Sequence, residues 1–293
     1  MVKLGTKIMT AEENIAIGAS HGSDAEDVYK LARDHSKRKL SAAYCPNVSI
    51  DDKARINDIR QAFSKENIVI AEVGGWKNML HPDPLEAKQA REQMAECLCV
   101  ADEVGALCTI TCIGTDSSPS MSAHSDQNFS QNSFEAAVEN ARWLVDTVNP
   151  KRASFVYEIY PFSVADSVAN VKKLIEAVDR PKFGAHMDLV NLINSPRLYY
   201  SSTYLAREFV RVLGKHIVSA HAKDLIMEQE VSVIMREVRP GLGVVDYPTY
   251  LKVLNELPQD VPLLIEHLES QEEYDKAARY IQNIANKENI KLR

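Results

Sequence analysis

Short apolar runs rich in β-branched residues alternate with longer helical patterns along the whole chain. This alternation is typical of a parallel sheet whose strands are joined by helices. Eight strands are predicted, at 4–9, 40–44, 68–73, 107–113, 154–160, 182–188, 217–223 and 262–268. Eight is the number of parallel strands that closes a barrel. We therefore predict an α/β fold of the (β/α)₈ TIM barrel type.

Helical patterns separate these strands, at 24–36, 50–65, 84–104, 132–148, 164–179, 200–214, 247–257 and 270–287. Ser23 or Asp24, Ser49 and Ser163 are predicted as N-caps, because their side chains can accept a hydrogen bond from a free backbone N–H. No linker rich in Pro, Ser or Gly interrupts the series, and 293 residues suit one large barrel. We expect a single domain over residues 1–293.

Two predicted connections are unusually long. Residues 114–131 are polar and rich in serine, and residues 224–246 follow the seventh predicted strand. Both leave the C-terminal end of a strand, which is where barrel enzymes keep their active sites. We expect these segments to be lid or substrate loops.

Charge and composition exclude several classes of protein. The net charge of −7 argues against a nucleic-acid partner, and no segment approaches the ~20 apolar residues of a membrane span. The opening MVKLGTKIM is too short and too polar for a signal peptide, so a cytoplasmic protein is expected. The five cysteines form an odd set without zinc-type spacing, and we expect reduced thiols that bind no metal.

Strand parity brings four ionisable residues to one end of the predicted barrel. Alternate residues of a barrel strand point inward. Counting in twos along the last four predicted strands places one ionisable residue near each C-terminal end, and these are Glu158, Asp188, His221 and Glu266. They are separated by 30, 33 and 45 residues, about one strand–helix unit per step. The four side chains are therefore expected to be neighbours around the ring.

Three carboxylates at a barrel mouth repel one another unless a cation neutralises them. Each could separately be the partner of a salt bridge, but their shared position on consecutive strand ends favours one divalent metal ion. Oxygen ligands with one imidazole suit Mn²⁺, Mg²⁺ or Co²⁺, and Zn²⁺ is a further alternative. Mn²⁺ is the preferred prediction.

The chain resembles a known family through the segments YE at 157–158, HMD at 186–188, HAKD at 221–224 and IEH at 265–267. In this order they look like the sugar phosphate isomerase/epimerase family of xylose isomerase-like TIM barrels, which includes ketose 3-epimerases, hydroxypyruvate isomerases and inosose dehydratases. The similarity covers nearly the whole chain and includes GLGVVDY at 241–247. The resemblance implies that Glu158, Asp188, His221 and Glu266 bind the metal, with Glu158 and Glu266 also acting as the acid/base pair.

The implied function is that of a metal-dependent isomerase or epimerase, which acts on a keto sugar or sugar derivative through proton abstraction next to a carbonyl and an enediolate. The alternative is a carbon–oxygen or carbon–carbon lyase at the same site. Such a lyase would resemble inosose dehydratases, or would act by β-elimination on 3-oxo-glycosides, as in C-glycoside deglycosidation with a small partner subunit. Many epimerases carry a histidine three residues after the metal-binding aspartate, but here that residue is Asn191, which cannot titrate near neutrality. This departure keeps the lyase alternative open.

Asn191 and six further residues are predicted to contact the substrate. Lys223 shares the face of His221 and could bind substrate oxygens or neutralise the carboxylates. His186 lies one layer below Asp188, where a hydrogen-bonded core histidine is an equal alternative. The other candidates are Glu72 and Trp76 as a sugar platform, His124 as a proton donor and Arg239 as a clamp for phosphate or carboxylate. Ordinary packing or surface exposure is the alternative for each of these.

Other functions find less support in the sequence. No GxGxxG, P-loop or GxSxG motif is present. Abasic-site endonucleases share the barrel and its metal-centred architecture, but they need a basic DNA-binding face and more histidines than the eight scattered here. A non-catalytic binding barrel would hold no metal. The expected partners are a small carbohydrate substrate and either further copies of the chain or a small partner subunit.

Overall fold

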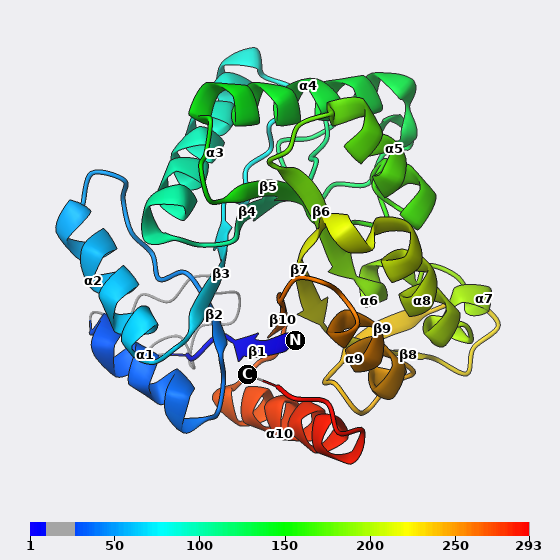
Figure 1. Ribbon diagram of the computed structural model, residues 1–293. Helices are drawn as coiled ribbons and strands as arrows, with labels where there is room; N and C mark the ends of the chain where they lie inside the picture. Colours follow the sequence, from blue (N-terminus) through cyan, green and yellow to red (C-terminus); the bar gives the residue numbers. More distant parts are fainter. Residues whose placement is uncertain (10–26, 293) are drawn as a thin grey trace.

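Eight parallel strands form a closed barrel in the computed structural model, which describes residues 1–9 and 27–292 (Figure 1). Around the barrel the order is β1-β10-β7-β6-β5-β4-β3-β2, so barrel strands that follow one another along the chain also lie side by side in the ring. The strands are β1 (Val2–Thr6), β2 (Ala42–Tyr44), β3 (Val69–Gly74), β4 (Cys108–Thr111), β5 (Ser154–Tyr157), β6 (Phe183–Asp188), β7 (Ile217–Ala222) and β10 (Val261–Ile265). The predicted TIM barrel is confirmed.

Helices surround the strand ring. They are α1 (Val28–Lys37), α2 (Lys53–Lys65), α3 (Pro84–Val104), α4 (Gln131–Val148), α5 (Val168–Val178), α6 (Leu189–Leu192), α7 (Pro196–Tyr199), α8 (Ser202–Leu213), α9 (Tyr247–Asn255) and α10 (Gln271–Lys287), with 3₁₀ turns η1 (Asp126–Phe129) and η2 (Gly214–His216). Helix α3 has the predicted bounds because its ends are well specified. Asp83 accepts the Leu85 N–H at 2.8 Å, and Gly105 ends the helix in the left-handed region at φ 78°.

Two predicted N-caps are wrong. Asp52, not Ser49, caps α2, and Ser167, not Ser163, caps α5. The Ser49 hydroxyl instead accepts the Asp51 N–H in a turn before α2. Ser163 does the same for Ala165. Serine stabilises turns as readily as helix ends, so sequence alone did not separate the two uses. The predicted cap at 23 or 24 lies outside the described residues.

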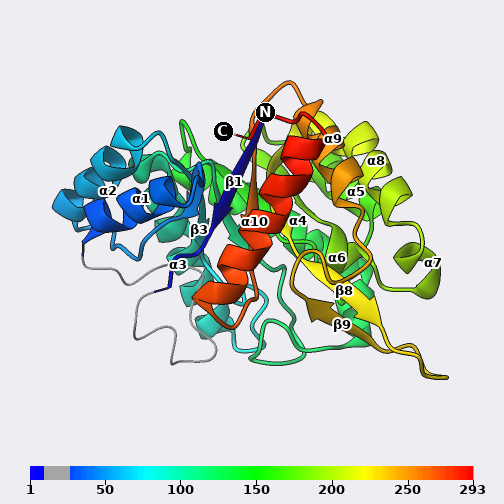
Figure 2. The same ribbon diagram turned by 90° about the horizontal axis from the view of Figure 1, so that it is seen from below.

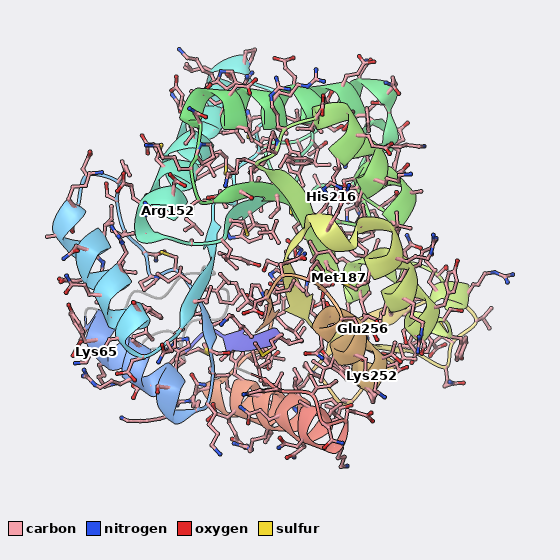
Figure 3. The ribbon with its side chains drawn as sticks, viewed as in Figure 1. Lys65, Arg152, Met187, His216, Lys252 and Glu256 are labelled. Carbon is pink, nitrogen blue, oxygen red and sulfur yellow. The ribbon has the colours of Figure 1, made fainter. Side chains whose placement is uncertain are left out.

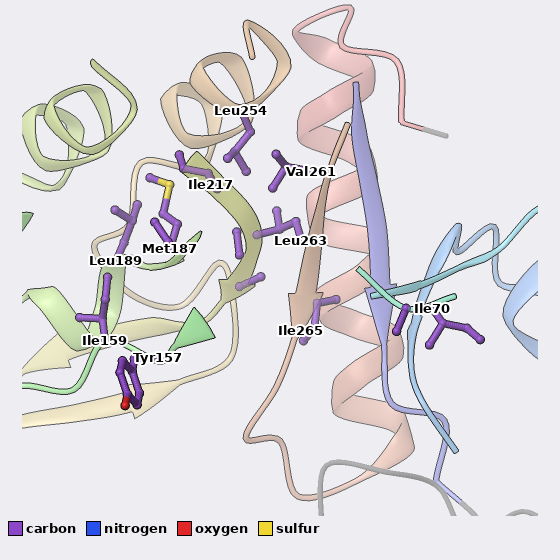
Figure 4. Close-up of a cluster of buried hydrophobic side chains, with 14 of the residues drawn as sticks. Ile70, Tyr157, Ile159, Met187, Leu189, Ile217, Leu254, Val261, Leu263 and Ile265 are labelled. Carbon is purple, nitrogen blue, oxygen red and sulfur yellow. The ribbon is translucent and has the colours of Figure 1, made fainter. Parts of the chain in front are cut away.

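Strand alternation separates an outer apolar layer from the barrel interior. Outward-pointing strand residues pack against the helices, and Figure 4 shows part of this layer with Ile217 and Leu263 on strands and Leu254 on α9. Cys108, Ile110 and Val156 form a separate inner cluster. Figure 3 shows the charged Lys252 on α9 and Glu256 directly after this helix, both outside the strand ring. Within the described ranges, no helix has the length and apolar character needed to cross a bilayer.

The segment 224–246, predicted as a loop, contains the antiparallel hairpin of β8 (Asp224–Met227) and β9 (Met235–Val238). Figure 2 shows the N-terminus and the end of α10 at one end of the barrel and this hairpin at the other. The hairpin is therefore placed at the end where the strands' C-terminal residues lie.

Asp224 anchors this hairpin to the barrel. Its carboxylate accepts backbone N–H groups of Leu225, Gly241, Gly243 and Val245 at 2.9–3.0 Å, and it is 1% exposed. A Cβ atom at position 243 would collide with this carboxylate, so the approach requires glycine. The GLG segment at 241–243 is thus a carboxylate-binding turn.

Asp224→Ala is expected to lower the free energy of unfolding by about 3–6 kcal/mol, because it leaves several N–H groups without an acceptor at about 1–3 kcal/mol each. Urea denaturation followed by circular dichroism measures the loss. The control is Asp52→Ala, which removes an exposed cap and should cost about 1 kcal/mol. Equal losses in the two variants would contradict the anchoring role of Asp224.

Candidate metal centre

Four consecutive strands of the ring position the predicted ligands. Glu158 directly follows β5, Asp188 ends β6, His221 lies on β7 and Glu266 directly follows β10. Asp188 and His221 are paired in the β6–β7 register, and the Glu158 N–H still donates to Thr111 O beyond the end of β5. One donor atom from each of the four lies within 4.8 Å of the others, and all four residues are buried. The structure thus brings the predicted set together.

The three carboxylates converge on one nitrogen of the imidazole. His221 Nδ1 lies 2.8 Å from Glu266 Oε1, 3.3 Å from Glu158 Oε1 and 3.7 Å from Asp188 Oδ2. His221 Nδ1 and Asp188 Oδ2 are buried, and within the described part of the chain their close contacts are ion pairs without hydrogen-bond geometry. Buried polar atoms are normally satisfied. Three carboxylate oxygens and one imidazole nitrogen are a donor set that could hold a divalent metal ion.

A lysine ammonium lies against the same oxygen atoms. Lys223 Nζ is 2.6 Å from Glu266 Oε1, 2.9 Å from Asp188 Oδ2 and 3.7 Å from Glu158 Oε1. Burial lowers the pKa of Lys223, but Asp188 and Glu266 outweigh it and raise this pKa well above its ordinary value. Burial likewise raises the pKa of Asp188, yet Lys223 and His221 bring it below its usual range. The carboxylates therefore form a cation-binding surface.

The charge state of His221 follows from its neighbours. Burial acts to lower its pKa, but Glu266, Tyr44, Glu72 and Asp188 raise it well above the ordinary value. The surrounding carboxylates thus favour the protonated form of this ring when no metal is bound.

A second group of polar residues lies deeper in the barrel, beneath His221. Glu72 Oε2 is 3.2 Å from His221 Nε2, and Glu72 Oε1 is 3.5 Å from His186 Nε2 and accepts the Ser219 hydroxyl. Glu72 is 1% exposed. Burial raises its pKa, and the two histidines reverse this and bring the pKa below its usual range. Glu72 is therefore turned toward the histidines, which corrects the expectation that it forms a sugar platform at the mouth.

Trp76 stays a predicted substrate contact, whereas His186 lies too deep to face a substrate. Trp76 is half-buried, has φ 33° and packs against the inner cluster of Cys108, Ile110 and Val156. His186 is fully buried with its ring 4.1 Å from that of His221. Its position in the layer below Asp188 agrees with the alternative of an interior histidine.

Asn191 connects the carboxylates on β5 and β6. Its backbone N–H donates to Asp188 Oδ1 at 3.0 Å at the start of α6. Its side-chain amide donates to Ile159 O at 2.9 Å and to Glu158 Oε1 at 3.3 Å, and Lys223 Nζ donates to its Oδ1 at 3.5 Å. Asn191 is thus part of the cluster and holds Glu158 in place.

Two predicted contacts have partners outside the four-residue cluster. His124 is exposed, and its ring stacks on Phe162 with a centroid distance of 3.5 Å. Arg239 donates to Glu273 on α10 at 2.8 Å. Both residues stand on long connections. Strand parity does not determine the course of such connections, so the sequence could not place these side chains.

The neighbours of the centre that were not predicted as site residues include Cys112 and Glu237. Cys112 Sγ donates to Glu158 Oε2 at 3.8 Å, and burial raises the pKa of this thiol. Parity could have found it, since it lies two residues beyond the inward Ile110. Glu237 on β9 approaches Lys223 Nζ to 3.8 Å, and no sequence signal indicated it because β9 was not predicted. All five cysteines are free thiols, as expected.

Comparison with known proteins identifies the family of this arrangement. A sequence profile described as xylose isomerase-like TIM barrel matches residues 23–284. None of the curated proteins matches the chain.

Solved structures of similar fold cover almost the whole chain. A xylose isomerase-like TIM barrel protein from Mycobacterium smegmatis in complex with magnesium has a TM-score of 0.67 at 15% identity, covering 98% of this chain and 97% of its own. D-psicose 3-epimerase with D-tagatose from Clostridium cellulolyticum H10 gives 0.68 at 13% identity, with 97% and 98% covered. A probable 3-DHS dehydratase from Bacillus anthracis gives 0.66 at 11% identity, with 97% and 99% covered. At these identities the likeness concerns the fold.

Proposed function

Because the chain belongs to the xylose isomerase-like TIM barrel family, we propose that it is a divalent-metal-dependent isomerase or epimerase that acts on a keto sugar or sugar derivative. The observation that carries the proposal is the convergence of three buried carboxylates and one imidazole at the end of the barrel where active sites of this fold lie. Family members of similar fold that act on sugars, such as the D-psicose 3-epimerase, support the substrate class.

Glu158, Asp188, His221 and Glu266 would hold the metal. Mn²⁺ is our preferred ion, and the magnesium in the Mycobacterium smegmatis relative supports Mg²⁺ as the alternative. When bound, such an ion supplies Lewis-acid polarisation of a substrate carbonyl, which acidifies the neighbouring C–H.

Glu158 and Glu266 would move the proton. In this proposal one carboxylate removes the proton from the carbon next to the carbonyl, and an enediolate results. The other carboxylate returns a proton, either to the opposite face of the same carbon or to the adjacent carbon. The first outcome is an epimer and the second an aldose–ketose isomer. Asn191 donates to Glu158 and Lys223 to Glu266, so each carboxylate is held in place by a separate neighbour.

Lys223 and Asn191 are the residues that we propose to contact substrate oxygens. Both border the carboxylate cluster and present nitrogen donors. Burial of the cluster excludes water, which strengthens these charge-assisted hydrogen bonds.

A lyase is the second candidate, and the amide of Asn191 is the observation that favours it. An amide at this position can bind a hydroxyl but cannot exchange protons with it near neutral pH. The same proton abstraction followed by loss of a β-substituent gives an unsaturated ketone instead of an epimer. The dehydratase of similar fold from Bacillus anthracis supports this alternative.

Incubation with Mn²⁺ in D₂O separates these outcomes. Ketoses, inososes and 3-oxo-glycosides are supplied as a panel, and products are followed by NMR. Deuterium at the carbon next to the carbonyl is expected for an epimer or isomer, because a proton is returned there, whereas an elimination product is an unsaturated ketone that has lost this proton. Absence of both deuterium incorporation and an elimination product with every substrate would contradict proton abstraction.

Glu158→Gln and Glu266→Gln are each expected to lower the rate of deuterium incorporation by about 10²-fold or more, because each removes one proton-transfer group. The matched control is Glu139→Gln on the exposed surface of α4, which should retain the wild-type rate. Full activity in either of the first two variants would show that the acid/base assignment is wrong.

A further inference from the structure

The ring of His221 lies between two sets of carboxylates. Nδ1 faces Glu158, Asp188 and Glu266, whereas Nε2 faces Glu72 Oε2 at 3.2 Å. A histidine that binds a metal through one ring nitrogen must present a lone pair there and carry its proton on the other nitrogen. The geometry therefore assigns Nδ1 to the metal and the N–H to Nε2.

Glu72 is the acceptor for that N–H. It stands on β3, across the barrel from β7, and is 1% exposed. A carboxylate at such a depth is costly unless it is hydrogen-bonded. Its partners among the described residues are His221, His186 and the hydroxyl of Ser219, so it is held at both oxygens by β6 and β7.

We propose that Glu72 is a positioning residue of the metal centre, which fixes the orientation and tautomer of His221 by accepting its Nε2–H. This inference rests on the proposed metal site. Carboxylates that accept the second N–H of a ligating histidine typically raise metal affinity by 10- to 100-fold. Glu72 contacts the proposed ligand His221 at Nε2, on the side of the ring away from the other three ligands, so it acts on the metal through this ring.

Glu72 could instead be a ligand of a second metal ion, and this role predicts a different number of bound ions. Glu72, His186 and His221 also lie close enough together to hold a cation of their own. In that arrangement Glu72 would be a ligand, and the protein would bind two metal ions with His221 bridging them. The number of ions bound per chain separates this role from positioning.

The test compares two substitutions at one position. Glu72→Gln keeps an oxygen that can accept from His221 Nε2 and an amide that can donate to Ser219, whereas Glu72→Leu removes the acceptor at similar volume. Isothermal titration with Mn²⁺ is expected to give one ion per chain in every case. The affinity should fall by about 10- to 100-fold in Glu72→Leu and by less than about 10-fold in Glu72→Gln.

Nitrogen-15 NMR of the Zn²⁺-loaded protein gives a readout that loss of stability alone does not change. In the wild type, one histidine should show a slowly exchanging Nε2–H and a metal-shifted Nδ1. Glu72→Leu should lose the slow exchange, and Glu72→Gln should retain it. Ser219→Ala is the matched control, because it removes a bond to Glu72 without removing the acceptor for His221.

Several results would overturn the inference. The first is a folded Glu72→Leu that keeps wild-type affinity for Mn²⁺ and a slowly exchanging Nε2–H. The second is a metal ion bound to Nε2 of His221. The third is a wild type that binds two ions per chain while Glu72→Leu binds one. If Glu72→Leu does not fold, a loss of affinity in Glu72→Gln as large as 100-fold overturns it instead. A wild type that binds metal as expected but incorporates no deuterium refutes the proposed function alone, whereas a wild type without metal affinity refutes both.

Discussion

Asp188→Asn is expected to lower the affinity for Mn²⁺ by about 10²- to 10⁴-fold, equivalent to the roughly 3–5 kcal/mol that removal of one buried charged partner typically costs. The reason lies in how Asp188 divides its two oxygens. Oδ1 accepts the Asn191 N–H at the start of α6, and Oδ2 faces Lys223 and His221. An asparagine can keep the first bond through its carbonyl and lose the anionic donor at Oδ2.

Isothermal titration measures this loss, and deuterium incorporation should fall in proportion. Asp52→Asn is the control, since Asp52 is also an N-cap aspartate, which accepts the Arg55 N–H at 2.9 Å on the exposed start of α2. It should bind Mn²⁺ as the wild type does. Unchanged affinity in Asp188→Asn would remove Asp188 from the ligand set.

Lys223→Met is expected to lower the stability of the metal-free protein by about 3–5 kcal/mol, because it leaves buried carboxylates without their ammonium partner. Lys223 Nζ contacts Glu266 Oε1 and Asp188 Oδ2, the same atoms that we propose as metal donors. A divalent metal can replace the missing charge. Saturating Mn²⁺ should therefore restore most of the lost stability, and the affinity for Mn²⁺ should rise.

Urea denaturation with and without Mn²⁺ measures both effects. Lys252→Met is the matched control, since Lys252 pairs with Glu288 at 2.5 Å on the surface, where an ion pair is worth about 0–1 kcal/mol. Its stability should hardly depend on Mn²⁺. If Mn²⁺ stabilises Lys223→Met no more than it stabilises the wild type, the lysine and the metal do not share these oxygens.

The sequence predicted the role of Asp188 more fully than the role of Lys223. Asp188 was assigned to the metal from strand parity, which needs only the period of two along β6. Lys223 was expected to bind substrate or to neutralise carboxylates, and the structure places it among the carboxylates. Parity put it on the correct face, but the reach of a long, flexible side chain depends on its neighbours.

The barrel and the four-residue cluster could be predicted from periodic patterns along the chain. Eight apolar runs of strand length have one closed arrangement, and alternation along each strand decides which side chains point inward. Both are local periodicities, so the sequence contains them directly.

The contacts across the barrel and the course of the long connections depend on how the closed barrel brings distant parts of the chain together. Glu72 and His221 are separated by 149 residues, and their pairing depends on the relative heights of β3 and β7 in the closed ring. The β8–β9 hairpin depends on the four N–H groups that converge on Asp224 from 225 and 241–245. Such contacts arise from closure and register, which no local pattern along the chain encodes.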